Sequence, residues 1–207
     1  MNNNNFQEDL NNIKNLDDEA SRLGIGGRSS PEKEERLYKE RMKKRKDIQT
    51  KRLEKRNLEK SLVLVFTGNG KGKTTAALGM ALRTLGHDQK IVIIQFIKGN
   101  WNTGEKKALQ NFAENVEWHS LGAGFTWETQ NRYEDEILVK KAWEVAKDYM
   151  KDENYKLVIL DEINIAIKLG YIQSEEIIKF IKGLNKKKNF CHIALTGRGA
   201  SKEIIEF

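Results

Sequence analysis

A glycine-rich loop that follows an apolar run constrains the fold of this chain more than any other feature. The run Leu62–Phe66 leads into Thr-Gly-Asn-Gly-Lys-Gly-Lys-Thr-Thr over residues 67–75, and a helical pattern begins at Thr75. Glycines let consecutive backbone N–H groups turn inward around phosphate oxygens, a lysine reaches the outer phosphates and a hydroxyl can bind Mg²⁺. The pattern therefore predicts a strand, a triphosphate-binding loop and a helix whose N-terminus attracts anions.

The loop departs at one position from the common pattern G-x-x-x-x-G-K-[ST]. Thr67 stands where that pattern has its first glycine, and the glycines of this chain occupy positions 68, 70 and 72. A Gly- and Lys-rich surface turn is the alternative interpretation. The strand before the loop and the helix after it favour a phosphate loop, with Lys73 and Thr74 as its polar residues.

Apolar runs and helical patterns alternate from Ser61 to the C-terminus, which is typical of an α/β fold with a parallel sheet. The predicted strands are 62–66, 91–97, 157–160 and 190–196, and the predicted helices are 75–85, 134–150 and 174–181. Gly86 is placed to end the first of these helices. We expect a P-loop NTPase-like domain with helices on a mostly parallel sheet, and ligands at the carboxyl ends of its strands.

Two carboxylates follow the predicted strand at 157–160. Asp161 and Glu162 come directly after four apolar residues, the form of the acidic strand that accompanies a phosphate loop. Mg²⁺ prefers oxygen ligands and is commonly held by one or two carboxylates together with phosphates. The hypothesis is a magnesium site formed by these residues, and the alternative is that they cap a following helix.

The segment Gly122–Arg132 fits neither a core strand nor an amphipathic helix. Its two glycines precede Phe125 and Trp127 and a polar run. Flexible glycines beside aromatic residues suggest a loop that lays rings against a flat ligand. Ordinary packing of the two rings is the alternative, and the residues alone do not name a ligand.

Composition restricts the cellular setting. The single cysteine, Cys191, excludes an intramolecular disulfide. We expect Cys191 to be a buried residue of a strand, and a nucleophile is the alternative. The chain contains no apolar stretch of the roughly 20 residues that span a bilayer, and its first residues lack a signal-peptide pattern. These features favour a cytoplasmic protein without a membrane partner.

The net charge of +7 lies almost entirely in one segment, because residues 31–60 hold thirteen Lys/Arg against seven Asp/Glu. Residues 32–60 are predicted to form a charged helix with a thin apolar stripe. Such a helix docks on another surface or, as the alternative, binds RNA. Residues 1–31, which are Asn-rich, are expected to be a disordered tail, and residues 61–207 are expected to form the P-loop domain.

Five motifs in this order resemble the ATP:corrinoid adenosyltransferases of the BtuR, CobO and CobP type. They are TGNGKGKTTAALG, QFIKGNWNTGE, GFTWETQNR, LVILDEI and TGRG. The similarity covers roughly residues 32–207. Members of that family also have threonine in place of the first glycine of the common loop pattern, as this chain does at Thr67. The resemblance implies transfer of the 5′-deoxyadenosyl group of ATP to cobalt(I) of a corrinoid, with release of triphosphate.

The resemblance also implies roles for individual residues. Lys73, Phe125 and Trp127 would be catalytic, the two rings displacing the lower ligand of cobalt(II) to allow its reduction. Thr74 and Glu162, with Asp161 nearby, would hold Mg²⁺. The triphosphate would be bound by Gly68, Asn69, Gly70, Lys71, Gly72, Lys73, Thr74, Thr75 and Arg198. For Arg198, capping or an ion pair is the alternative role.

Further implications concern partners. A reduced flavoprotein or similar donor would supply electrons, and the N-terminal helix would close over the corrinoid site in a homodimer. Relatives commonly continue beyond the TGRG motif with another strand, so we expect the C-terminus to be truncated and the strand at 190–196 to be less protected. The rival hypotheses are a P-loop ATPase or kinase, and a nucleic-acid-binding module that uses the basic helix.

Overall fold

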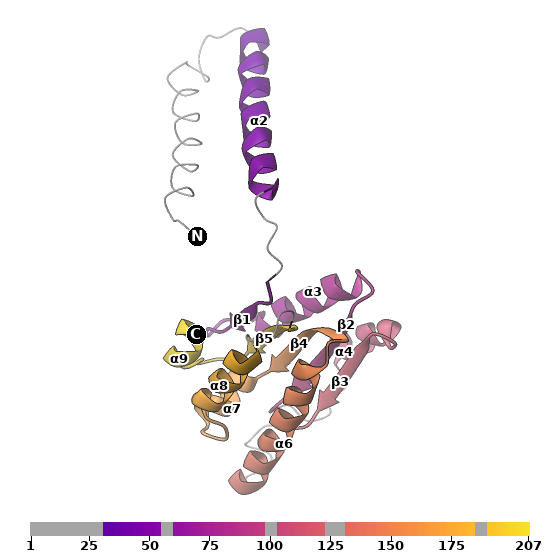
Figure 1. Cartoon of the computed structure of the whole chain (residues 1–207), viewed down its shortest axis with the longest axis vertical. Coiled ribbons are helices and arrows are strands. Elements are labelled where there is room, and N and C mark those ends of the chain that lie inside the picture. Colours follow the sequence, from indigo (N-terminus) through magenta and orange to yellow (C-terminus); the bar gives the residue numbers. More distant parts are fainter. Residues whose placement is uncertain (1–30, 55–59, 98–102, 123–130, 185–189) are drawn as a thin grey trace. The chain divides into compact units, whose positions relative to one another are not determined.

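The computed structural model describes residues 31–54, 60–97, 103–122, 131–184 and 190–207. The chain divides into two compact units, Met1–Glu59 and Lys60–Phe207, and each is described by itself (Figure 1). In the described residues, no helix is both long enough and apolar enough to cross a bilayer.

The described part of the first unit is helix α2 (Pro31–Glu54). Its first turn carries acidic side chains and its last turn basic ones, which complements the helix dipole. Ion pairs one turn apart, such as Lys39 with Glu35 at 2.6 Å, lie on its exposed surface. The expected tail lies outside the described residues, as do residues 55–59 of the expected helix.

A five-stranded sheet forms the centre of the second unit. Its strands are β1 (Val63–Phe66), β2 (Lys90–Gln95), β3 (Val116–Ser120), β4 (Tyr155–Asp161) and β5 (His192–Thr196). They lie in the order β1-β5-β4-β2-β3, and every neighbouring pair is parallel. The expected α/β fold with a parallel sheet is confirmed. Strands β2 and β4 are buried on both faces over most of their length, which explains their continuous apolar sequences.

Helices cover both faces of this sheet (Figure 1). One face packs on α3 (Lys73–Leu85) and α4 (Gly104–Leu109), which the short 3₁₀ helix η1 (Gln110–Phe112) follows. The other face packs on α6 (Arg132–Lys151), α7 (Ile163–Lys168), α8 (Ser174–Leu184) and α9 (Lys202–Glu206). The sheet is therefore the middle layer of three.

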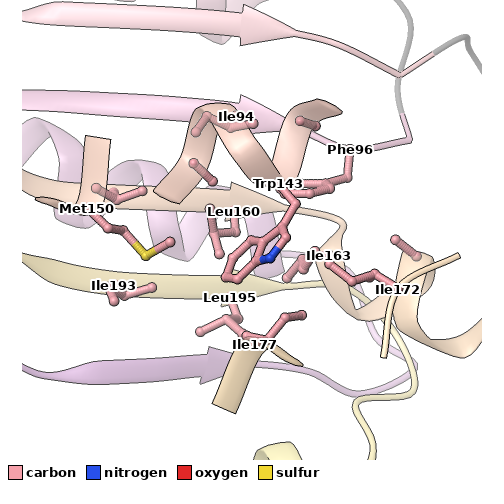
Figure 2. Close-up of a cluster of buried hydrophobic side chains, with 14 of the residues drawn as sticks. Ile94, Phe96, Trp143, Met150, Leu160, Ile163, Ile172, Ile177, Ile193 and Leu195 are labelled. Carbon is pink, nitrogen blue, oxygen red and sulfur yellow. The ribbon is translucent and has the colours of Figure 1, made fainter. Parts of the chain in front are cut away.

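Trp143 of α6 is the largest fully buried side chain of the second face. Figure 2 shows its indole beside Leu160 and Leu195 of the sheet and near Ile163 and Ile177 of the neighbouring helices. Its ring also meets that of Phe180 edge to face, with 5.5 Å between centroids. Burial of this aromatic surface fixes α6 and α8 against the strands that carry the site.

Some predicted boundaries and the predicted position of one strand in the sheet are wrong. Helix α3 begins at Lys73, not Thr75, because left-handed Gly72 ends the loop there. The expectation that residues 190–196 lie at a weakly protected edge is also wrong. Strand β5 is bonded on both sides, by β1 and β4, and β1 is at the edge instead. Strand order depends on where the crossover helices pack, which the order of the motifs does not reveal.

Strand β3 was not predicted, since its sequence Val-Glu-Trp-His-Ser has no continuous apolar run. It is the other edge strand of the sheet, and most of its residues are only half-buried. An edge strand needs fewer apolar residues than a central one, so the sequence signal is correspondingly weak.

Candidate active site

The candidate site lies where the carboxyl ends of the five parallel strands come together. This edge of the sheet runs across all five strands and is distinct from the edge strands β1 and β3. The terminal residues are aligned by strand pairing: Phe66 pairs with Thr196, and Gln95 pairs with both Asp161 and Ser120. Polar side chains from distant parts of the sequence are therefore brought together by parallel pairing alone.

The loop between β1 and α3 has the conformation that its glycines allow. Gly68 has φ +114° and Gly72 has φ +100°, values that L residues with a side chain rarely adopt. A Cβ atom at either position would meet nothing within 4 Å, so conformation and not crowding requires glycine. The backbone of this loop is exposed and accessible to an anion.

Lys73, the first residue of α3, folds back over this loop. Its Nζ atom donates hydrogen bonds to the carbonyl oxygens of Gly68 at 2.9 Å and Gly70 at 2.5 Å. The ammonium group thus lies beside the loop backbone, close to the first turn of a helix that itself favours anions. Asn69 and Lys71 of the loop and Thr75 of the helix are exposed around it.

Asp161 connects the phosphate loop to the centre of the sheet. It is fully buried, and its Oδ1 atom accepts hydrogen bonds from the hydroxyls of Thr74 at 2.9 Å and Thr196 at 2.8 Å. A hydroxyl has one proton and two lone pairs. Because Thr74 donates its proton to Asp161, its lone pairs are available to a metal ion or another donor.

The other oxygen of Asp161 is held by Gln95, for which no role was predicted. The Nε2 atom of Gln95 donates to Oδ2 of Asp161 at 3.2 Å. Its Oε1 atom accepts from Nε1 of Trp118 at 3.0 Å and from the hydroxyl of Ser120 at 2.9 Å. The only available sequence signal was a polar residue inside the apolar run 91–97, so the partners of Gln95 could not be identified without strand pairing.

Glu162 follows Asp161 in a left-handed conformation, with φ 62°. Its backbone N–H donates to Oγ1 of Thr196 at 2.9 Å. It stands at the N-cap position of α7, but its side chain makes no capping hydrogen bond, so the capping alternative is not supported. Positive φ in a residue with a side chain is a strained conformation that is found frequently at functional sites.

Arg198 is exposed and lies on the turn after β5, between Gly197 and Gly199. Both glycines have positive φ, +127° and +67°. The helix that follows is capped by Ser201, whose hydroxyl accepts from the N–H of Ile204 at 3.4 Å, so Arg198 is not its N-cap residue. Because β5 and β1 are parallel neighbours, the turn with Arg198 and the phosphate loop follow the carboxyl ends of adjacent strands.

Two predicted catalytic residues, Phe125 and Trp127, lie outside the described residues. The chain enters their segment through Gly122, where a Cβ atom would come within 2.6 Å of the backbone carbon of Ile97. Glycine is required there because the backbones at the ends of β2 and β3 approach each other closely.

A metal ion at this edge would depend on few protein ligands. Within the described ranges, no group of three or more His, Cys, Asp or Glu side chains gathers in a way that could hold a metal. The donors that are present, a threonine hydroxyl beside a carboxylate, are oxygen atoms and fit Mg²⁺ that is bound mainly by phosphates and water.

Cys191 lies far from this chemistry, at the amino end of β5. It is buried, lines a cavity of ≈ 190 Å³ with Met150 and Tyr155, and its thiol is 3.9 Å from the carbonyl oxygen of Met150. Burial raises the pKa of the Cys191 thiol to about 12. A thiol that stays protonated is a poor nucleophile, which agrees with a structural role.

Comparison with known proteins identifies the family. The sequence model described as ATP:corrinoid adenosyltransferase BtuR/CobO/CobP matches residues 59–207. A corrinoid adenosyltransferase of a Sinorhizobium species is 40% identical over 183 residues, which cover 88% of this chain and 85% of that protein. The corrinoid adenosyltransferase of Pseudomonas aeruginosa is 41% identical over 177 residues, covering 86% and 85%. That of Escherichia coli K12 is 37% identical over 169 residues, covering 82% and 84%. This chain belongs to the ATP:corrinoid adenosyltransferase family.

Proposed function

We propose that this chain transfers the 5′-deoxyadenosyl group of ATP to cobalt(I) of a corrinoid and releases triphosphate. The observation that carries the proposal, beside family membership, is the junction at Asp161. There the hydroxyl of Thr74, at the start of the helix after the phosphate loop, is fixed by a fully buried carboxylate at the end of the acidic strand β4. A phosphate loop joined to an acidic strand in this way supports binding of a nucleotide triphosphate.

The reaction is a displacement at the ribose. Two electrons of cobalt(I) form a bond to C5′, the bond between C5′ and its oxygen breaks, and triphosphate departs with that electron pair. Negative charge increases on the leaving oxygen, so groups that stabilise the triphosphate as a leaving group lower the barrier.

The residues of the phosphate loop supply this stabilisation. The backbone of the loop and the N-terminus of α3 bind phosphate oxygens, and Lys73 adds a positive charge beside Gly68 and Gly70. Arg198 binds a phosphate from the turn after β5. Arginine is suited to this role because its planar group forms two parallel hydrogen bonds to phosphate.

Mg²⁺ is part of the proposal, since its preferred oxygen donors are present. Thr74 and Glu162 hold the ion, and Asp161 supports them by fixing the proton of the Thr74 hydroxyl. When bound, Mg²⁺ neutralises charge on the triphosphate. The assigned ligands are few, as expected for an ion that keeps several waters.

Phe125 and Trp127 are proposed to pack beneath the corrin ring and displace the lower ligand of cobalt(II). Apolar rings offer no competing donor atom and exclude water, so cobalt(II) becomes easier to reduce. A reduced flavoprotein or similar donor supplies the electron. We further propose a cytoplasmic homodimer that does not bind nucleic acid.

The test is product analysis on the full chain. Protein, Mg-ATP and a prereduced corrinoid are incubated, adenosylation is followed by absorbance, and triphosphate is assayed in the same sample. We expect one triphosphate for each adenosylated corrinoid. Formation of ADP and phosphate instead would support an ATPase or kinase and refute the proposal.

Lysine variants test the assignment of the loop. Lys73→Ala is expected to abolish turnover with cobalt(II) and with prereduced cobalt(I), because the charge beside the triphosphate is lost. Lys90→Ala is the matched control, since Lys90 is exposed at the amino end of β2, opposite the site. Retained activity in Lys73→Ala would remove this lysine from the active site.

A further inference from the structure

Thr67 makes a contact that accounts for its departure from the common phosphate-loop pattern. Its Oγ1 atom accepts a hydrogen bond from the backbone N–H of Ala200 at 3.1 Å, across 133 positions of sequence. Among the described residues, the non-glycine positions with positive φ are Asp88 and Glu162, so the backbone at Thr67 does not need glycine. A side chain can therefore be used at this position.

The partner of Thr67 belongs to a short turn, residues 197–200, which we name the arginine turn because it carries Arg198. The turn is held at its first residue as well. Gly197 donates its N–H to the carbonyl oxygen of Phe66 at 3.2 Å, and its own carbonyl oxygen accepts from Nδ2 of buried Asn164 at 3.4 Å. Both ends of the turn are thus fixed, with Arg198 between them.

Crowding around Gly197 further restricts the arginine turn. A Cβ atom at Gly197 would lie 3.0 Å from Cβ of Asn164 and 3.1 Å from Oε2 of Glu162. At its first residue, the turn therefore lies directly against the acidic end of β4 and the start of α7. The last residue of the turn, Ala200, contacts the phosphate loop through its hydrogen bond to Thr67.

We propose that Thr67 is a positioning residue that fastens the arginine turn to the phosphate loop, so that Arg198 is directed at the bound triphosphate. The inference rests on the proposed function for the identity of the anion. Arginine has many rotamers, and fixing its backbone reduces the ordering that phosphate binding requires. Threonine suits the position because its β-branched side chain is stiff and its hydroxyl accepts the N–H of Ala200.

The experiment measures binding of inorganic tripolyphosphate and of Mg-ATP to the full chain by titration calorimetry. Thr67→Val keeps the shape of the side chain but replaces the hydroxyl acceptor by a methyl group. Thr67→Gly removes the side chain and restores the glycine of the common pattern. We expect both variants to bind tripolyphosphate about three- to tenfold more weakly, as for loss of one hydrogen bond. Thr67→Ser keeps the hydroxyl and should bind within about twofold of the wild type.

A double-mutant cycle with Arg198→Ala separates positioning from general loss of structure. If Thr67 acts through Arg198, Thr67→Val causes no additional loss once Arg198 is alanine. Additive losses, unchanged binding in Thr67→Val, or an equal loss in Thr67→Ser would each overturn the inference. Thermal unfolding of every variant confirms that the folded protein is being titrated.

The assay separates this inference from the proposed function, because it contains neither corrinoid nor reductant. Loss of the coupling between Thr67 and Arg198 would refute the positioning role and leave adenosyl transfer untouched. Conversely, a chain that fails to transfer adenosyl groups can still show the coupling.

Discussion

The amide of Gln95 is expected to contribute strongly to stability, although it touches no proposed substrate. Gln95 is 4% exposed and connects three other side chains. The change to test is Gln95→Met, which keeps the length of the side chain and removes both polar atoms. The variant leaves Oδ2 of Asp161 without this donor, and Trp118 and Ser120 without this acceptor.

The magnitude follows from the three hydrogen bonds. A bond to a charged group contributes about 1.5–3 kcal/mol, and the one from Gln95 to Asp161 is buried. The bonds from Trp118 and Ser120 are half-buried, so water can replace them and each adds only about 0.5 kcal/mol. We therefore expect a loss of about 2.5–4 kcal/mol in the free energy of unfolding, or about 5–15 °C in Tm.

Urea denaturation of the wild type and the variant measures this loss. Gln89→Met is the matched control, because Gln89 lies exposed in the turn after α3 and the same atoms are changed there. A loss below about 0.5 kcal/mol in Gln95→Met, or one equal to that of the control, would refute the reasoning that this amide satisfies a buried carboxylate.

Three other predictions follow from the site and the core. Trp127→Ala should chiefly impair turnover that starts from cobalt(II), and equal losses with prereduced cobalt(I) would contradict displacement of the lower ligand. Burial raises the pKa of the Cys191 thiol to about 12, so iodoacetamide at pH 8 should modify it rapidly only after unfolding in urea; rapid labelling of the folded chain would count against this. Burial, and to a lesser extent Lys156, lowers the pKa of His192 below its usual 6.5, and its Nδ1 atom accepts from the N–H of Leu62 at 3.1 Å. This contribution to stability is present above pH 6.5 and is lost as the pH falls through the lowered pKa. His192→Asn should therefore make the free energy of unfolding less dependent on pH below 6.5. An unchanged pH dependence would contradict the assignment.

Much of the fold could be predicted because its signals are local. Strands β2 and β4 are buried on both faces, so nearly every residue in them is apolar. Elements with weak local signals were missed: β3 is a half-buried edge strand, and α7 has only six residues. The phosphate loop was recognised because positive φ requires glycine at Gly68 and Gly72.

The candidate site was predictable only in part. Lys73, Thr74, Asp161 and Arg198 were named as candidates because each belongs to a continuous motif, and their roles stay predictions. Gln95, Thr196 and Asn164 were missed, since a polar residue at the end of a strand has no local pattern that names its partner. Their roles depend on contacts between residues that lie at least 33 positions apart in the chain.

The sequence by itself determined the parallel α/β class, the phosphate loop and the acidic strand, because backbone conformation and burial on both faces select residue types locally. Only the tertiary structure decided that β5 lies between β1 and β4. That arrangement brings Thr196 to Asp161 and places Ala200 within reach of Thr67. The threonine that departs from the common loop pattern thereby has a partner, and the physical reason is strand order, which depends on packing of the whole domain.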